Sequence, residues 1–114
     1  MTPRPPLLLE VISEGPHCVP CEYAISAVDL VAREFGPLVR VQVLETKRPR
    51  DGRRFMELCR RLQGAPPVPS VWIQGRLAFE GIPPLDQLRR RLKKALGWAD
   101  NHSKESSRCP TRSW

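Results

Sequence analysis

The chain of 114 residues suits one compact domain and is too short for two, and its hydrophobic content of 40% is that of a globular protein. Four cysteines are too few for a disulfide-rich secreted scaffold, and no apolar run approaches the length of a membrane span. The net charge of +7 comes without an aromatic ladder or a nucleic-acid motif, so we interpret it as a solvated basic surface that an acidic protein partner could approach.

The apolar run over residues 5–12 does not resemble a secretion signal. It is short, it is interrupted by Glu10, and no small-residue cleavage site follows it. We therefore expect a cytoplasmic protein, and in that compartment a CxxC pair is redox-active or metal-binding more often than permanently oxidised.

The first half of the chain predicts a strand, a helix and a second strand. Residues 7–13 are apolar nearly throughout, which is typical of a buried strand. Apolar residues at helical spacing predict a helix over about 20–35, which Gly36 and Pro37 end. Residues 38–45 alternate between apolar and polar side chains, which predicts a second strand.

The second half predicts a helix, a hairpin and a final helix. The expected ranges are 51–63 for the first helix, 70–74 and 77–81 for the hairpin strands, and about 83–97 for the final helix. Gly75 and Arg76 are expected to form the hairpin turn. Cys59 lies on the apolar stripe of the helix over 51–63, which predicts a buried core thiol.

This order, β-α-β-α-β-β-α, predicts an α/β fold with a mixed four-stranded central sheet flanked by helices. The first two strands are joined through a helix and should be parallel, whereas the hairpin strands should be antiparallel. Residues 1–98 are expected to form the domain. Residues 99–114 lose all periodicity and are rich in serine and charge, so we expect a disordered basic tail.

The segment "GPHCVPCEYA" (15–24) places Cys18 and Cys21 where the first strand leads into the first helix. The thiolate is the attacking species, and the unpaired N–H groups of a helix N-terminus stabilise it. Cys18 at the lip of the helix should be exposed and should attack a substrate disulfide, whereas Cys21, about one turn inward, should be shielded and should resolve the mixed disulfide. Pro20 fits the first turn, where its missing N–H has no helical partner.

Charged neighbours would act on this thiol in opposite directions. A protonated His17 would stabilise the Cys18 thiolate, although a plain surface histidine explains His17 equally well. Glu14 and Glu22 would disfavour the thiolate, so the sign of the net effect stays open.

Three segments resemble the thioredoxin superfamily, and more narrowly its small glutaredoxin-like or thioredoxin-like redox proteins. They are "CVPC" (18–21), "VPSVWIQGRLAFEG" (68–81) and "IPPLDQLRRRLKKAL" (82–96), within a resemblance that covers residues 7 to about 97. The resemblance implies a thioredoxin-like fold, a disulfide-containing protein substrate, a thiol or reductase as electron donor, and no cofactor.

The resemblance also implies a substrate-binding surface beside the cysteines. Pro69 would be cis and lie next to the CxxC pair, and the main chain of Val68 would bind the substrate backbone. The residues His17, Val19 and Pro20 complete the expected surface.

The sequence departs from both parent families. Ile12 stands where thioredoxin carries a buried aspartate, so Glu10 or Glu14 would have to replace that acid. The lysine and the Gly-Gly segment that glutaredoxins use on glutathione are missing, which favours a protein disulfide as substrate.

Two other functions stay open. A zinc module would combine Cys18 and Cys21 with His17, His102 or Cys109, but the sequence has no second paired knuckle. A thioredoxin-fold adaptor would act by protein binding alone. Because two intact cysteines make redox cycling the simpler interpretation, we predict a thiol-disulfide oxidoreductase that binds no metal.

Overall fold

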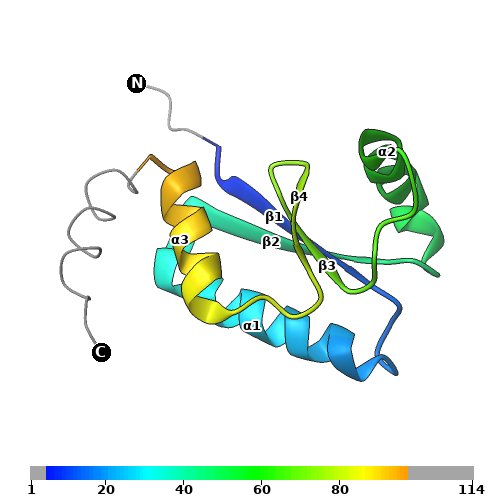
Figure 1. Cartoon of the computed structure of the whole chain (residues 1–114), viewed down its shortest axis with the longest axis horizontal. Coiled ribbons are helices and arrows are strands. Elements are labelled where there is room, and N and C mark those ends of the chain that lie inside the picture. The colour runs from blue at the N-terminus through cyan, green and yellow to red at the C-terminus, as the bar shows by residue number, and fades with distance from the viewer. Residues whose placement is uncertain (1–4, 98–114) are drawn as a thin grey trace.

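The computed structural model describes residues 5–97 and contains the predicted β-α-β-α-β-β-α order (Figure 1). The elements are β1 (Leu7–Ser13), α1 (Val19–Phe35), β2 (Val39–Glu45), α2 (Gly52–Leu62), β3 (Ser70–Ile73), β4 (Arg76–Glu80) and α3 (Leu85–Ala95). Short 3-10 turns over Gly36–Leu38 and Pro49–Asp51 lead into β2 and α2. The expected tail from residue 99 onward, with His102 and Cys109, lies outside the described residues.

The four strands form one mixed sheet, which confirms that prediction, and their order in the sheet is β2-β1-β3-β4. β1 pairs with β2 in parallel and with β3 antiparallel, and β3 pairs with β4 antiparallel. β1 is a central strand covered on both faces, and every residue of β1 except the half-buried Leu8 is buried. This explains why its sequence is apolar nearly throughout.

The hairpin turn between β3 and β4 lies one residue earlier than expected. Arg76 pairs with Ile73, so Gln74 and Gly75 form the two-residue turn. Both have positive φ, at 51° and 80°, as the turn type that matches the twist of a hairpin requires. The prediction that Gly75 and Arg76 form the turn was wrong. Gly75 takes the second turn position, so Arg76 is already paired with β3 as the first residue of β4.

The helices cover the two faces of the sheet unequally. Helices α1 and α3 pack together on one face, over a core that includes Leu9, Val11, Val28 and Leu88. Helix α2 covers the other face over a smaller cluster of Ile12, Leu44, Leu58 and Trp72 (Figure 1).

Cys59 does not belong to the buried residues of this smaller cluster. It is a free thiol and only half-buried, so the expectation of a buried core thiol was wrong. Leu58 is the buried residue of α2, because this short helix turns only one narrow side toward the sheet.

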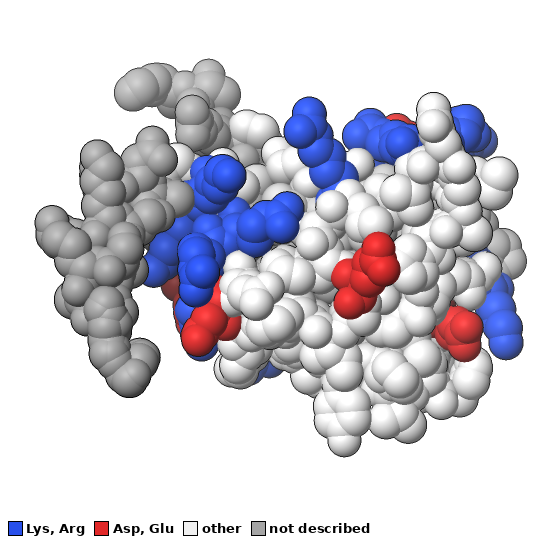
Figure 2. All heavy atoms as spheres, in the orientation of Figure 1, with Lys and Arg blue, Asp and Glu red and all other residues white. Residues whose placement is uncertain are grey.

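The basic residues lie mainly on the helices. On the face drawn in Figure 2, Lys and Arg gather over α3 at the left and over α2 at the upper right. Helix α3 buries Leu88 and Leu92 and exposes basic residues on its other side, as expected of a solvated amphipathic helix. None of the helices within residues 5–97 has the length and apolar content that crossing a membrane requires.

Candidate active site

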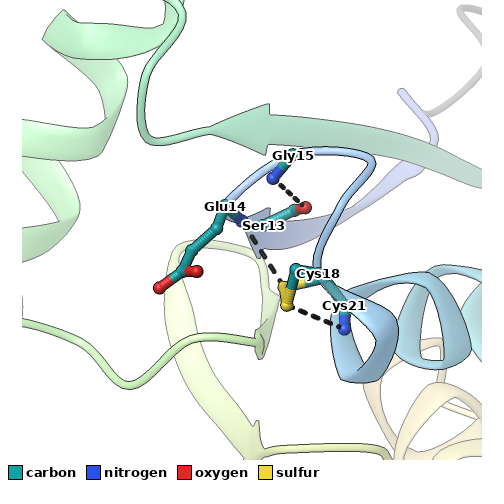
Figure 3. The surroundings of a disulfide bond; sticks show 5 residues. All are labelled: Ser13, Glu14, Gly15, Cys18 and Cys21. Atoms are coloured by element: carbon teal, nitrogen blue, oxygen red, sulfur yellow. Dashed lines mark hydrogen bonds between the residues drawn. A yellow bond between two sulfur atoms is a disulfide. The ribbon is translucent and has the colours of Figure 1, made fainter.

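A disulfide joins Cys18 and Cys21 at the point where the loop after β1 enters α1 (Figure 3). The two Cα atoms are 5.2 Å apart, and the spacing of three residues forms a closed ring across the first helical turn. The predicted pair is therefore joined in one site, in its oxidised form.

Backbone N–H groups surround the two sulfur atoms. Cys18 is the N-cap of α1, with an extended backbone, and its Sγ accepts a hydrogen bond from the Cys21 N–H at 3.3 Å. The Glu14 N–H donates to the Cys21 Sγ at 3.4 Å (Figure 3). The Cys21 N–H belongs to the first turn of α1, at the positive end of the helix dipole, where it stabilises negative charge on the Cys18 sulfur.

The two cysteines differ in accessibility, and this difference distinguishes their chemistry. Cys21 is fully buried, whereas Cys18 is half-buried and retains contact with solvent. Cys18 is less exposed than the sequence predicted, but it is still the sulfur that a second molecule can reach. Pro20 follows in the first turn of α1, as predicted.

The loop between β1 and the disulfide depends on Gly15. Its φ is +126°, in the region that L side chains rarely adopt. The Gly15 N–H donates to the Ser13 Oγ at 3.0 Å, and the Gly15 carbonyl accepts from the Cys18 N–H at 3.1 Å. The exposed His17 folds over this loop, since a Cβ added to Gly15 would lie 3.4 Å from the His17 Cε1.

Val68 and Pro69 lie beside the end of β1. They directly precede Ser70, which pairs with Ile12, and the peptide bond between them is cis. The Pro69 carbonyl accepts the Gly81 N–H at 2.8 Å. The N–H and carbonyl of Val68 have no hydrogen-bond partner within residues 5–97, so both are open to a bound chain.

Exposed apolar side chains border the disulfide. Val19 and Tyr23 are each 61% exposed and lie one helical turn apart on α1. Ile82, which is 48% exposed, follows Gly81 next to Pro69. The sequence analysis missed Tyr23 and Ile82. The spacing of four residues between Val19 and Tyr23 could have indicated that both lie on the same side of α1. Ile82 is distant in sequence and comes near the site because the N–H of its neighbour Gly81 bonds to the Pro69 carbonyl.

Neither Glu10 nor Glu14 provides the free buried carboxylate that would replace the aspartate expected at position 12. Glu10 is buried, but both of its carboxylate oxygens bind Arg54 at 2.7 Å. This bond raises the pKa of the Arg54 guanidinium above its already high ordinary value. Glu14 is exposed, and its carboxylate extends away from the sulfur atoms (Figure 3). Ile12 is fully buried.

Metal ligands do not gather around the disulfide. Within residues 5–97, no group of three His, Cys, Asp or Glu side chains is arranged to hold a metal ion. His102 and Cys109, the other ligands considered for a zinc site, lie outside this range.

Comparison with known proteins identifies the fold. No family model matches the sequence, and no curated protein matches it either. Among solved structures, the chain is similar to the one described as "Crystal structure of chloroplastic thioredoxin z defines a novel type-specific target recognition". The two share 19% sequence identity and a TM-score of 0.58, over 80% of this chain and 79% of that chain. The chain therefore has the predicted thioredoxin-like fold, with a disulfide at CxxC spacing.

Proposed function

We propose that this protein is a thiol-disulfide oxidoreductase that cycles between a Cys18–Cys21 disulfide and the dithiol. The observation that carries the proposal is the difference between the two sulfur atoms at the start of α1: Cys21 is fully buried and Cys18 is accessible. A structural disulfide gains nothing from such a position, whereas an exchange reaction needs one accessible and one shielded sulfur.

In the reduced protein, the Cys18 thiolate attacks one sulfur of a substrate disulfide. The substrate S–S bond breaks, its second sulfur leaves as a thiolate and takes a proton, and a mixed disulfide with Cys18 forms. The Cys21 thiolate then attacks the Cys18 Sγ, which restores the internal disulfide and releases the other substrate sulfur. Two electrons and two protons pass from the protein dithiol to the substrate, and a thiol or a reductase supplies them again.

The substrate is a protein disulfide. An extended segment of the substrate would bind the open N–H and carbonyl of Val68 in the manner of an added strand, next to Pro69. His17, Val19 and Pro20 would contact the same segment from the other side of the disulfide. The lack of the glutaredoxin lysine and Gly-Gly segment supports a protein substrate over glutathione.

The wider cellular context is also a proposal. We place the protein in the cytoplasm, where a reducing environment suits a disulfide reductase. An acidic protein partner would meet the cations of α2 and α3 rather than the disulfide itself. Membrane and nucleic-acid partners have no support in the sequence motifs.

A redox titration of the full chain tests the proposal. The protein is equilibrated in thiol buffers of known potential, trapped by alkylation, and analysed by mass spectrometry for free thiols at each cysteine, and its metal content is measured in the same sample. We expect a reversible two-electron transition at Cys18 and Cys21, with Cys59 alkylated throughout. Stoichiometric zinc that protects both thiols would instead establish the metal module. A cysteine pair that cannot be reoxidised would overturn the oxidoreductase proposal and favour the thioredoxin-fold adaptor, which acts by protein binding alone.

A further inference from the structure

The carboxylates of this protein fall into two groups that differ in position. Seven of the ten Asp and Glu side chains within residues 5–97 form an ion pair with an Arg in the same range. Three carboxylates in this range form none: Glu14, Glu22 and Glu80. All three are exposed.

These three carboxylates border the disulfide region. The backbone N–H of Glu14 binds the Cys21 Sγ, and Glu22 directly follows Cys21 in the first turn of α1. Glu80 ends β4 opposite Ser70, beside the Val68–Pro69 bond. Three residues with unpaired carboxylates thus flank the disulfide and the Val68–Pro69 bond, where the proposed substrate would bind.

The unpaired cations of the described residues lie mainly elsewhere. Arg53 and Arg60 are on α2, and Arg90 and Lys94 are on α3. Lys47 is a cation near the site, because it follows Thr46, whose N–H binds the Ser13 carbonyl at the end of β1. The disulfide region therefore has the opposite sign to the protein as a whole.

Screening decides which of these charges a docked partner meets. At an ionic strength of about 0.15 M, the Debye length is about 8 Å, so exposed cations on distant helices are largely screened from the disulfide region. Charges around a docking surface act chiefly through the association rate and through the choice of partner.

We propose that the disulfide of this protein serves partner proteins whose reactive cysteine is flanked by lysine or arginine. This inference rests on the proposed oxidoreductase function and adds the charge of the partner. The partner segment combines apolar contact with Val19 and Tyr23 and cations facing Glu14, Glu22 and Glu80. An acidic segment at the same place would meet unpaired carboxylates of like charge, which costs binding free energy.

The test uses short peptides with one cysteine, held in a mixed disulfide with 5-thio-2-nitrobenzoate, whose release is followed by absorbance. The cysteine is flanked by lysine, glutamate or serine in three otherwise identical peptides. Attack by the Cys18 thiolate on the peptide sulfur releases the coloured thiolate, and Cys21 then releases the peptide thiol. The readout is the ratio of the rates for the lysine and glutamate peptides, because any change in Cys18 reactivity cancels in that ratio.

We expect the reduced full chain to favour the lysine peptide roughly tenfold at about 0.15 M salt, with the serine peptide between. The variant Glu14→Gln/Glu22→Gln/Glu80→Gln should lower the ratio to about twofold or less, since the local charges are gone. The control Asp29→Asn/Asp86→Asn/Gln87→Lys changes the net charge by the same amount on α1 and α3 and should keep the preference.

The outcomes separate the two proposals. In one outcome, the wild type releases the coloured thiolate from the serine peptide, Cys18→Ser does not, and the ratio of the lysine and glutamate rates is near one. This outcome would overturn the charge preference and leave the oxidoreductase proposal in place. An equal loss of preference in the control variant would assign the effect to net charge and overturn the local surface. If Cys18→Ser reacts as fast as the wild type with all peptides, both proposals fall.

Discussion

Glu10 and Arg54 form a two-point ion pair between the central strand β1 and helix α2. The Arg54 Nε and Nη2 donate to the two Glu10 carboxylate oxygens, each at 2.7 Å, and only 2% of the Glu10 side chain is exposed. Arg54 also donates to Glu57, which in turn binds Arg61, so the buried carboxylate connects to a network along α2. This pair fixes α2 on its face of the sheet.

Removal of Arg54 should destabilise the protein strongly. The variant Arg54→Met leaves Glu10 charged and buried without a partner, and we expect the free energy of unfolding to fall by about 3 kcal/mol. Glu10→Met/Arg54→Met should recover most of this loss, because apolar side chains replace both charges. Urea denaturation of the single and double variants measures the difference, with Glu57→Gln as an exposed control. A loss below about 1 kcal/mol in Arg54→Met would contradict the role of this ion pair.

Single cysteine variants should trap one half of the proposed reaction. Cys21→Ser keeps the accessible nucleophile but lacks the resolving thiol, so a covalent adduct with a disulfide substrate should accumulate. Cys18→Ser should form none at the same position, because Cys21 is fully buried. Non-reducing electrophoresis and mass spectrometry show the adducts, and Cys59→Ser should cycle as the wild type does. Adducts of equal yield on Cys18→Ser and Cys21→Ser would show that the assigned roles are wrong.

The loop before the disulfide should not tolerate a side chain at Gly15. Its φ of +126° is unfavourable for alanine, so Gly15→Ala should cost about 1–3 kcal/mol of stability and should slow reduction of a model disulfide. Gly52 provides the matched control. It begins α2 with a φ of −61° and has no neighbouring atom within 4 Å of an added Cβ, so Gly52→Ala should be neutral or slightly stabilising. Equal effects at both glycines, measured by denaturation, would contradict this account.

The Glu34–Arg89 ion pair between α1 and α3 should make stability depend on pH. The hydrogen bond from Arg89 lowers the pKa of Glu34 in the folded protein, so the pair stabilises the fold above the ordinary carboxyl pKa. This contribution is lost as the pH falls through the lowered pKa. Arg89→Gln should therefore be less stable than the wild type at about pH 7, and the difference should shrink at about pH 3.

Two measurements check this prediction. Urea denaturation at both pH values gives the stability difference, and NMR titration should show the pKa of Glu34 raised in Arg89→Gln. Arg90→Gln is the control, because Arg90 forms no ion pair with a described residue. A pKa of Glu34 that stays lowered in Arg89→Gln would assign the effect to another group, such as Lys93.

Local patterns in the sequence were sufficient for the elements and for the two cysteines. The apolar run of β1, the helical spacing of α1 and the alternation in β2 each depend on a few neighbouring residues, and the structure contains all three at nearly the predicted positions. The position of the CxxC pair at the start of a helix is equally local, because the cap and the first turn involve adjacent residues. The order of these elements predicted an α/β fold with a mixed sheet, and the resemblance to the thioredoxin superfamily implied the thioredoxin-like fold.

Only the tertiary structure decided which charges from distant segments are paired. Glu10 and Arg54 are 44 positions apart, and no periodicity indicates that they meet across β1 and α2. The same is true of the unpaired Glu80, which comes near the disulfide region through strand pairing with Ser70. The half-buried state of Cys59 also depends on how much of the sheet α2 covers. Long-range ion pairs, the position of Glu80 and the burial of Cys59 all depend on contacts between distant segments. These contacts form only when the whole chain is folded.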